Sequence, residues 1–201
     1  MRDETFLRVL DEAVEAIDRT GIPWALIGGI ASVCLGRPRW TRSHEDIDFF
    51  IRHEDASVAL EALEQRGFET EEHNEQWIYK GTKEGVLVDV IFRSSGNLYL
   101  DEDMIERFRE VEFRDRKVKV VSPEDLLVMK VVAHGEETFS YWWDALGLVA
   151  RNDLDWDYLI KRATRHGARR TLSLLLYAES EDLVVPWNVI EELYGTIRQA
   201  S

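Results

Sequence analysis

Residues 43–51 read SHEDIDFFI, and this stretch decides how the first half of the chain folds. Asp46 and Asp48 alternate with Ile47 and Phe49, and successive side chains of a strand point to opposite faces. In a strand the two carboxylates would therefore share one face, about 7 Å apart along the backbone, while the apolar side chains enter the core. Two oxygen ligands on one face suit Mg²⁺, or Mn²⁺ in its place, bound jointly by carboxylates and substrate phosphates. The stretch predicts a strand with a divalent-metal site.

Two adjacent glycines, Gly28 and Gly29, precede this strand. They stand between an apolar segment at 24–27 and a second one at 30–35. The pattern predicts a short buried strand, a glycine turn and a helix. Backbone N–H groups at a helix N-terminus bind phosphate, so the glycine turn and the two acids make sense as one site.

A third acid, Asp89, lies inside the apolar run at 86–92. An unpaired carboxylate in a buried strand carries a large desolvation penalty, which sharing a cation would relieve. The alternatives without a functional site are a tight turn for the glycines and an exposed strand face for Asp46 and Asp48. The apolar residues at 49–51 argue against that exposed face.

Composition bounds the function before any motif is considered. The chain has 201 residues, 45% of them apolar, and a formal charge of −14 from 39 acids against 25 bases. Such a surface as a whole repels DNA, RNA and anionic membranes, although a local basic patch could still bind them, so we expect neither extended DNA or other non-specific nucleic-acid binding nor a membrane partner. Cys34 is the single cysteine, which excludes an intramolecular disulfide and a Cys-rich zinc site. Without a signal sequence or a long apolar run, a cytoplasmic location is the default.

The elements change in kind near Ser122, which divides the chain into an α/β half at 1–121 and a helical half at 122–201. The sequence SPED at 122–125 combines an N-cap serine, a proline at the first helical position and an acid three residues after the cap, which predicts a helix start. The predicted strands are 24–27, 46–51, 77–80, 86–92, 111–113 and 117–121, with a turn at 81–85. The predicted helices are 6–17, 30–35, 56–66, 141–150, 156–165, 168–178 and 189–197, besides the one that starts at 122.

Taken in order, the glycine pair, the Asp46-Ile47-Asp48 string and Asp89 resemble the nucleotidyltransferase superfamily of the polymerase-beta type. The resemblance covers residues 24–92 well and the helical half more loosely. It implies a small mixed sheet flanked by helices, with a C-terminal helical subdomain. It also implies transfer of a nucleoside monophosphate from a nucleoside triphosphate to an acceptor hydroxyl.

The same resemblance implies which residues form the site. The acids would be both catalytic and metal-binding, the glycines would take the terminal phosphates, and the basic residues would contact the nucleotide. The metal-binding and catalytic set is Asp46, Asp48 and Asp89, and the nucleotide-binding set is Gly28, Gly29, Arg42, His44 and Lys130.

Two stretches resemble different branches of the superfamily. Residues 41–48 look like the small antibiotic-modifying adenylyltransferases, which implies a small cationic acceptor similar to an aminoglycoside. Residues 122–130 resemble the AbiEii-like and MenT-like group, which includes toxins of toxin–antitoxin systems and implies a tRNA or protein acceptor and an antitoxin partner. Many AbiEii-like members have Thr or Ser where this chain has His44. A third alternative is a non-catalytic module that binds a nucleotide or regulates a partner.

Aromatic and basic residues of the helical half invite a further interpretation. Trp142 and Trp143 could stack a base or a drug ring, but neighbouring positions on a helix point about 100° apart, so at most one faces a given pocket. A basic cluster could meet the end of an RNA acceptor or form an ordinary salt-bridged surface. The cluster comprises Arg162, Arg165, Arg169 and Arg170.

Overall fold

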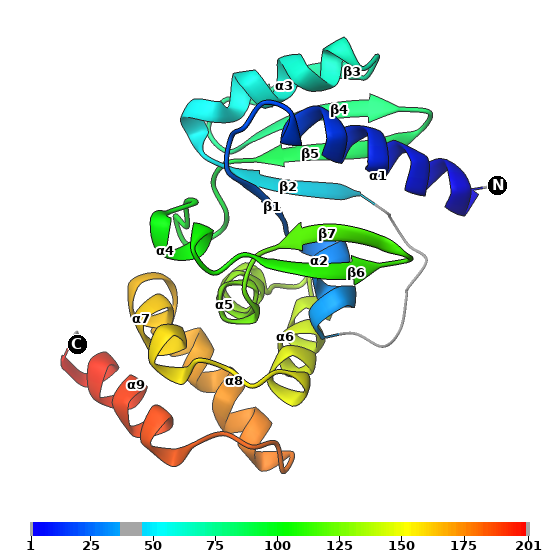
Figure 1. Ribbon diagram of the computed structural model, residues 1–201. Coiled ribbons are helices and arrows are strands. Elements are labelled where there is room, and N and C mark those ends of the chain that lie inside the picture. The colour runs from blue at the N-terminus through cyan, green and yellow to red at the C-terminus, as the bar shows by residue number, and fades with distance from the viewer. Residues whose placement is uncertain (1, 37–45, 200–201) are drawn as a thin grey trace. The chain divides into compact units, whose positions relative to one another are not determined.

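The computed structural model describes residues 2–36 and 46–199 (Figure 1). Its contacts divide the chain into two compact units. The sheet unit comprises the described residues 2–31, 46–94 and 99–121, and the helical unit comprises 32–36, 95–98 and 122–199.

All strands of the described residues belong to one seven-stranded sheet in the sheet unit, with the order β3-β4-β5-β2-β1-β7-β6. The strands are β1 (Trp24–Leu26), β2 (Ile47–Ile51), β3 (Glu69–Asn74), β4 (Ile78–Lys83), β5 (Val86–Ile91), β6 (Arg109–Phe113) and β7 (Arg116–Val120). β2 runs parallel to β5 and β1 runs parallel to β7, while every other neighbouring pair is antiparallel. The mixed sheet confirms the predicted fold class.

Helices α1 (Arg2–Asp18) and α3 (Ala56–Gln65) cover one face of this sheet, as Figure 1 shows. Phe49, Phe50 and Ile51 are all fully buried, because β2 lies in the middle of the sheet, and their alternating side chains show that both faces of the strand are covered. A 3₁₀ turn, η1 (His53–Asp55), leads into α3, and α4 (Glu102–Ile105) begins after the N-cap Asp101.

Three details of the sheet unit differ from the sequence prediction. β3 was not predicted, because most of its side chains are exposed and no apolar alternation marks it. β4 continues through Gly81 to Lys83 instead of turning at 81–85, and the turn is formed by Glu84 and Gly85, both with positive φ. The four-residue α4 was not predicted either, because it is too short to show a repeating apolar pattern.

Helix α2 (Gly28–Leu35) begins in the sheet unit and ends in the helical unit. In the helical unit, its end lies against α6 (Ser140–Arg151): the Asn152 side-chain amide donates to the Leu35 carbonyl oxygen at 2.8 Å, and the Arg151 guanidinium donates to the Gly36 carbonyl oxygen at 3.0 Å. A Cβ on Gly36 would meet the backbone nitrogen of Leu148 at 3.0 Å, so this close packing depends on glycine.

The other helices of the helical unit are α5 (Pro123–Ala133), α7 (Trp156–His166), α8 (Ala168–Ser180) and α9 (Trp187–Gln199). The predicted start of α5 is confirmed, since the Ser122 hydroxyl accepts from the Asp125 backbone N–H at 3.1 Å. None of the described helices is long and apolar enough to cross a bilayer.

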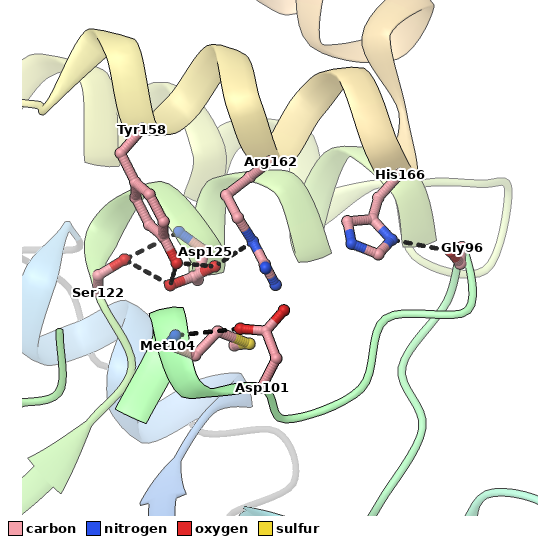
Figure 2. Close-up of polar contacts among 8 residues, drawn as sticks. All are labelled: Gly96, Asp101, Met104, Ser122, Asp125, Tyr158, Arg162 and His166. Carbon is pink, nitrogen blue, oxygen red and sulfur yellow. Dashed lines mark hydrogen bonds and ion pairs between the residues drawn. The ribbon is translucent and has the colours of Figure 1, made fainter. Parts of the chain in front are cut away.

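A buried polar cluster joins α5 to α7 (Figure 2). The Tyr158 hydroxyl donates to the Asp125 carboxylate at 2.9 Å, and the Arg162 Nε lies 2.8 Å from the same carboxylate. Asp125 and Arg162 are fully buried, so each charge needs the other in a medium of low dielectric constant. Arg162 therefore belongs to the interior of the helical unit, and not to a surface cluster with Arg165, Arg169 and Arg170.

Candidate active site

Strands β2 and β5 set two of the predicted acids side by side. Asp48 and Asp89 are direct partners in the parallel register. Asp46 precedes Asp48 by two residues, immediately before β2, and the intervening Ile47 is fully buried while both acids are partly accessible. The three carboxyl groups therefore belong to the same face of neighbouring strands.

Gly28 brings the start of α2 against the Asp48 carboxylate. Its φ is +62°, and a Cβ at this position would lie 1.8 Å from Asp48 Oδ2. A backbone hydrogen bond next to this contact keeps the two segments together, since the Ile27 N–H donates to the Asp48 carbonyl oxygen at 2.9 Å. Gly29 differs, because nothing lies within 4 Å of a Cβ built on it. The two adjacent glycines thus have different roles: one permits close packing and the next borders open space.

Asp89 is 9% exposed, and burial raises the pKa of its carboxyl. The Lys80 ammonium lowers that pKa and the neighbouring Asp46 carboxylate raises it further, so the net pKa lies above the ordinary value. Lys80 Nζ lies 3.6 Å from Asp89 Oδ1, too far for a hydrogen bond, and within the described part of the chain Oδ1 has no hydrogen-bond partner.

Lys80 is a further residue of the candidate site that the sequence pattern does not mark. It is opposite Asp89 in the antiparallel register of β4 and β5. A turn at Glu84 and Gly85 implies this pairing by simple counting, because positions 80 and 89 are equally distant from it. The prediction of a longer turn at 81–85 concealed the signal.

No group of three or more His, Cys, Asp or Glu side chains within the described residues is arranged to hold a metal ion on its own. Mg²⁺ rarely requires such a group, because one or two carboxylates usually share it with water and substrate phosphates. The fit of this site to a metal therefore depends on Asp46 and Asp48 together with a bound triphosphate.

The remaining predicted residues lie elsewhere. Arg42 and His44 fall outside the described residues. Lys130 belongs to the helical unit, where its side chain is buried, with Nζ 3.1 Å from Asp144 Oδ2 and 4.0 Å from the centroid of the Tyr141 ring. This pairing gives Lys130 a structural role in the helical unit, and contact with a nucleotide remains a hypothesis.

The family comparison decides what kind of protein this is. Residues 1–181 match the model of a family described as uncharacterised nucleotidyltransferase. The chain belongs to this family. The resemblance drawn from the glycine pair and the three acids is thereby confirmed at the level of the superfamily. Among curated proteins, none matches the sequence significantly.

Solved structures share the fold of this nucleotidyltransferase. The antibiotic-resistance factor ANT(2'')-Ia is 19% identical with a TM-score of 0.52, over 89% of this chain and 94% of that one. The lincosamide antibiotic adenylyltransferase LnuA, solved with lincomycin, is 21% identical with a TM-score of 0.50, over 70% of this chain and 94% of that one. An antigenic nucleotidyltransferase-like protein from Paracoccidioides brasiliensis is 15% identical with a TM-score of 0.50, over 92% and 91% of the two chains.

Proposed function

We propose that this nucleotidyltransferase uses a divalent metal to move a nucleoside monophosphate from a nucleoside triphosphate to an acceptor hydroxyl. The observation that carries the proposal is the register of β2 and β5, which pairs Asp48 with Asp89 while Gly28 packs the start of α2 against the Asp48 carboxylate. Acids and a helix N-terminus in one place supply what a triphosphate needs, namely a shared cation and backbone N–H donors.

The residues fit a metal ion of the Mg²⁺ or Mn²⁺ type. Asp46 and Asp48 would hold it with hard carboxylate oxygens, and the buried Asp89 Oδ1, without a hydrogen bond in the described residues, is a further oxygen that a cation would satisfy. When bound, such a metal neutralises the charge that develops on the phosphates and on the departing pyrophosphate.

The chain's own groups have distinct tasks in this proposal. Backbone N–H groups at the start of α2, near Gly28 and Gly29, bind the terminal phosphates. Asp89 is the general base, held beside Asp48 by the register of β2 and β5. Its carboxylate accepts the proton of the acceptor hydroxyl as that oxygen bonds to the α-phosphorus. The bond from the α-phosphorus to the bridging oxygen then breaks, and pyrophosphate leaves.

Two acceptor classes compete. A small antibiotic is favoured by the fold neighbours, since LnuA was solved with lincomycin and ANT(2'')-Ia with adenylyl-2''-tobramycin. The AbiEii-like segment at 122–130 supports tRNA or a protein instead, in a toxin with an antitoxin partner. Arrest of growth on expression would support the toxin, whereas resistance to an aminoglycoside or a lincosamide would support the antibiotic enzyme.

The test is transfer of label from each of four α-³²P nucleoside triphosphates, with Mg²⁺ or Mn²⁺, to total tRNA, to the protein itself, to an aminoglycoside or to a lincosamide. We expect labelled product from the native chain and none from the Asp46→Asn/Asp48→Asn protein. The matched control is Glu61→Gln/Glu64→Gln, which removes the same charge from exposed positions of α3. Metal-dependent nucleotide binding without transfer to any acceptor would favour the non-catalytic module.

A further inference from the structure

A hollow of about 290 Å³ lies within the helical unit, at the C-terminal end of α5. We propose that it binds one nucleotide, with an aromatic base against Trp142 and a phosphate against the arginines. The hollow is lined by Val131, His134, Trp142, Arg169, Arg170 and Ser173. The inference concerns the helical unit alone and holds whether or not the sheet unit transfers nucleotides.

The charge of this hollow is opposite to that of the whole molecule. The chain carries a formal charge of −14, yet the lining, as far as the described residues form it, includes two guanidinium groups and no carboxylate. Arg170 Nη1 donates to the carbonyl oxygens of Val132 at 2.9 Å and His134 at 2.6 Å, which fixes the guanidinium at the end of α5. No carboxylate among the described residues forms an ion pair with Arg170. A fixed guanidinium without an acidic partner suits a phosphate, which it can contact through its other nitrogens.

The aromatic side of the hollow is also fixed in place. The Trp142 ring lies 5.4 Å from the His134 ring and 6.1 Å from the Tyr177 ring, measured between centroids. An indole held by two neighbouring rings gives a planar surface on which a base can stack at little cost in side-chain freedom. The indole N–H has no hydrogen-bond partner in the described part of the chain, so it is a donor for a base or a phosphate.

Size and charge together restrict the ligand. Pockets for drug-sized molecules start at about 300 Å³, and this hollow of about 290 Å³ has room for one base with its phosphate. A polycationic ligand would be repelled by Arg169 and Arg170. The chemistry fits a free mononucleotide and an unpaired nucleotide at the end of an RNA equally well.

The experiment measures fluorescence anisotropy of a short labelled single-stranded RNA on the full-length Asp46→Asn/Asp48→Asn protein in EDTA, with unlabelled AMP and CMP as competitors. Two variants place negative charge in the hollow at exposed positions of α8: Arg169→Glu and Ser173→Asp. Two variants are used so that a folding defect in either leaves the other informative. The matched control is Arg198→Glu, which makes the same charge change at an exposed position of α9.

We expect each variant in the hollow to weaken RNA binding at least about tenfold, because charge-assisted hydrogen bonds to phosphate are lost and repulsion replaces them. Arg198→Glu should leave the affinity within about twofold. Competition by AMP or CMP would assign the site to free nucleotides, and its absence would assign the site to an RNA end. The inference is overturned if the RNA does not bind, or if Arg169→Glu and Ser173→Asp bind it as strongly as the protein without these changes.

Discussion

Gly28 is the residue whose replacement says most about the candidate site. In Gly28→Ala the new Cβ would collide with the Asp48 carboxylate, and alanine would have to adopt a left-handed φ of +62°. We expect the free energy of unfolding to fall by about 1–3 kcal/mol and nucleotide transfer to be lost. Urea unfolding followed by circular dichroism, together with the labelled-nucleotide assay, checks both effects.

The adjacent Gly29 provides the matched control. A Cβ there meets nothing within 4 Å, and alanine favours a helix over glycine by about 1 kcal/mol. Gly29→Ala should therefore fold at least as stably as the native chain. Equal stabilities of the two alanine variants would contradict the steric role assigned to Gly28.

Asp89 should reveal its burial through the pH dependence of stability. Because burial raises the pKa of the folded carboxyl above its unfolded value, this group stabilises the fold below the unfolded pKa and loses that effect as pH rises through the folded pKa. In the absence of metal, Asp89→Asn should therefore be more stable than the native chain near pH 7, by about 0.5–2 kcal/mol. The difference should shrink as the pH falls, in urea unfolding measured from pH 3 to pH 8 in EDTA.

Lys80 gives the companion test of the same carboxyl. The ammonium at 3.6 Å lowers the pKa of Asp89, so Lys80→Met should raise that pKa further and move the loss of stability to higher pH. If the free energies of unfolding of the native chain and of Asp89→Asn differed by the same amount at every pH, Asp89 would not have a raised pKa in the folded state.

At the scale of elements, the start of α5 depends on Ser122. Its hydroxyl accepts from the Asp125 N–H at 3.1 Å and donates to the Asp125 carboxylate at 2.8 Å, all buried. Ser122→Ala removes the cap and one partner of a buried charge, so we expect a loss of about 1–2 kcal/mol in thermal or urea unfolding. Ser180→Ala, at an exposed hydroxyl bonded only to the Tyr177 carbonyl oxygen, should change stability by less than about 0.5 kcal/mol. Similar losses in both variants would argue against a special role for the cap.

The elements also show why some of the fold could be predicted and some could not. β2 and the start of α5 carry strong local signals, namely alternating side chains and a cap with proline. β3 is an edge strand whose side chains are mostly exposed, so hydrophobicity does not mark it. Gly81 suggested a turn, but a Cβ there would lie 3.5 Å from Leu63 Cδ1, so the residue is a strand position facing α3.

For the candidate site, the resemblance grouped Asp46, Asp48 and Asp89 in one set, but the local pattern of the sequence did not show how the strands bring them together. The pairing of Asp48 with Asp89 depends on β2 lying beside β5, which is a property of the sheet order and not of either strand alone. The same is true of Lys80, whose proximity to Asp89 comes from the hairpin register. Long-range pairing therefore accounts for what the local pattern left out.

At the scale of the whole molecule, the charge of −14 separates two effects of salt on stability. Any salt screens the repulsion among surplus acids, so NaCl and MgCl₂ at equal ionic strength should raise the melting temperature similarly through screening. A specific site adds to this, because a ligand that binds only the folded state stabilises it by about 2.7 kcal/mol at a concentration one hundred times its dissociation constant. With a nucleoside triphosphate present in both salts, because Asp46 and Asp48 share the metal with its phosphates, we expect an extra rise in MgCl₂ for the native chain. That extra rise should be lost in Asp46→Asn/Asp48→Asn and retained in Glu61→Gln/Glu64→Gln. An extra rise of the same size in all three proteins would assign the Mg²⁺ effect to the acidic surface and remove the support for metal binding at β2.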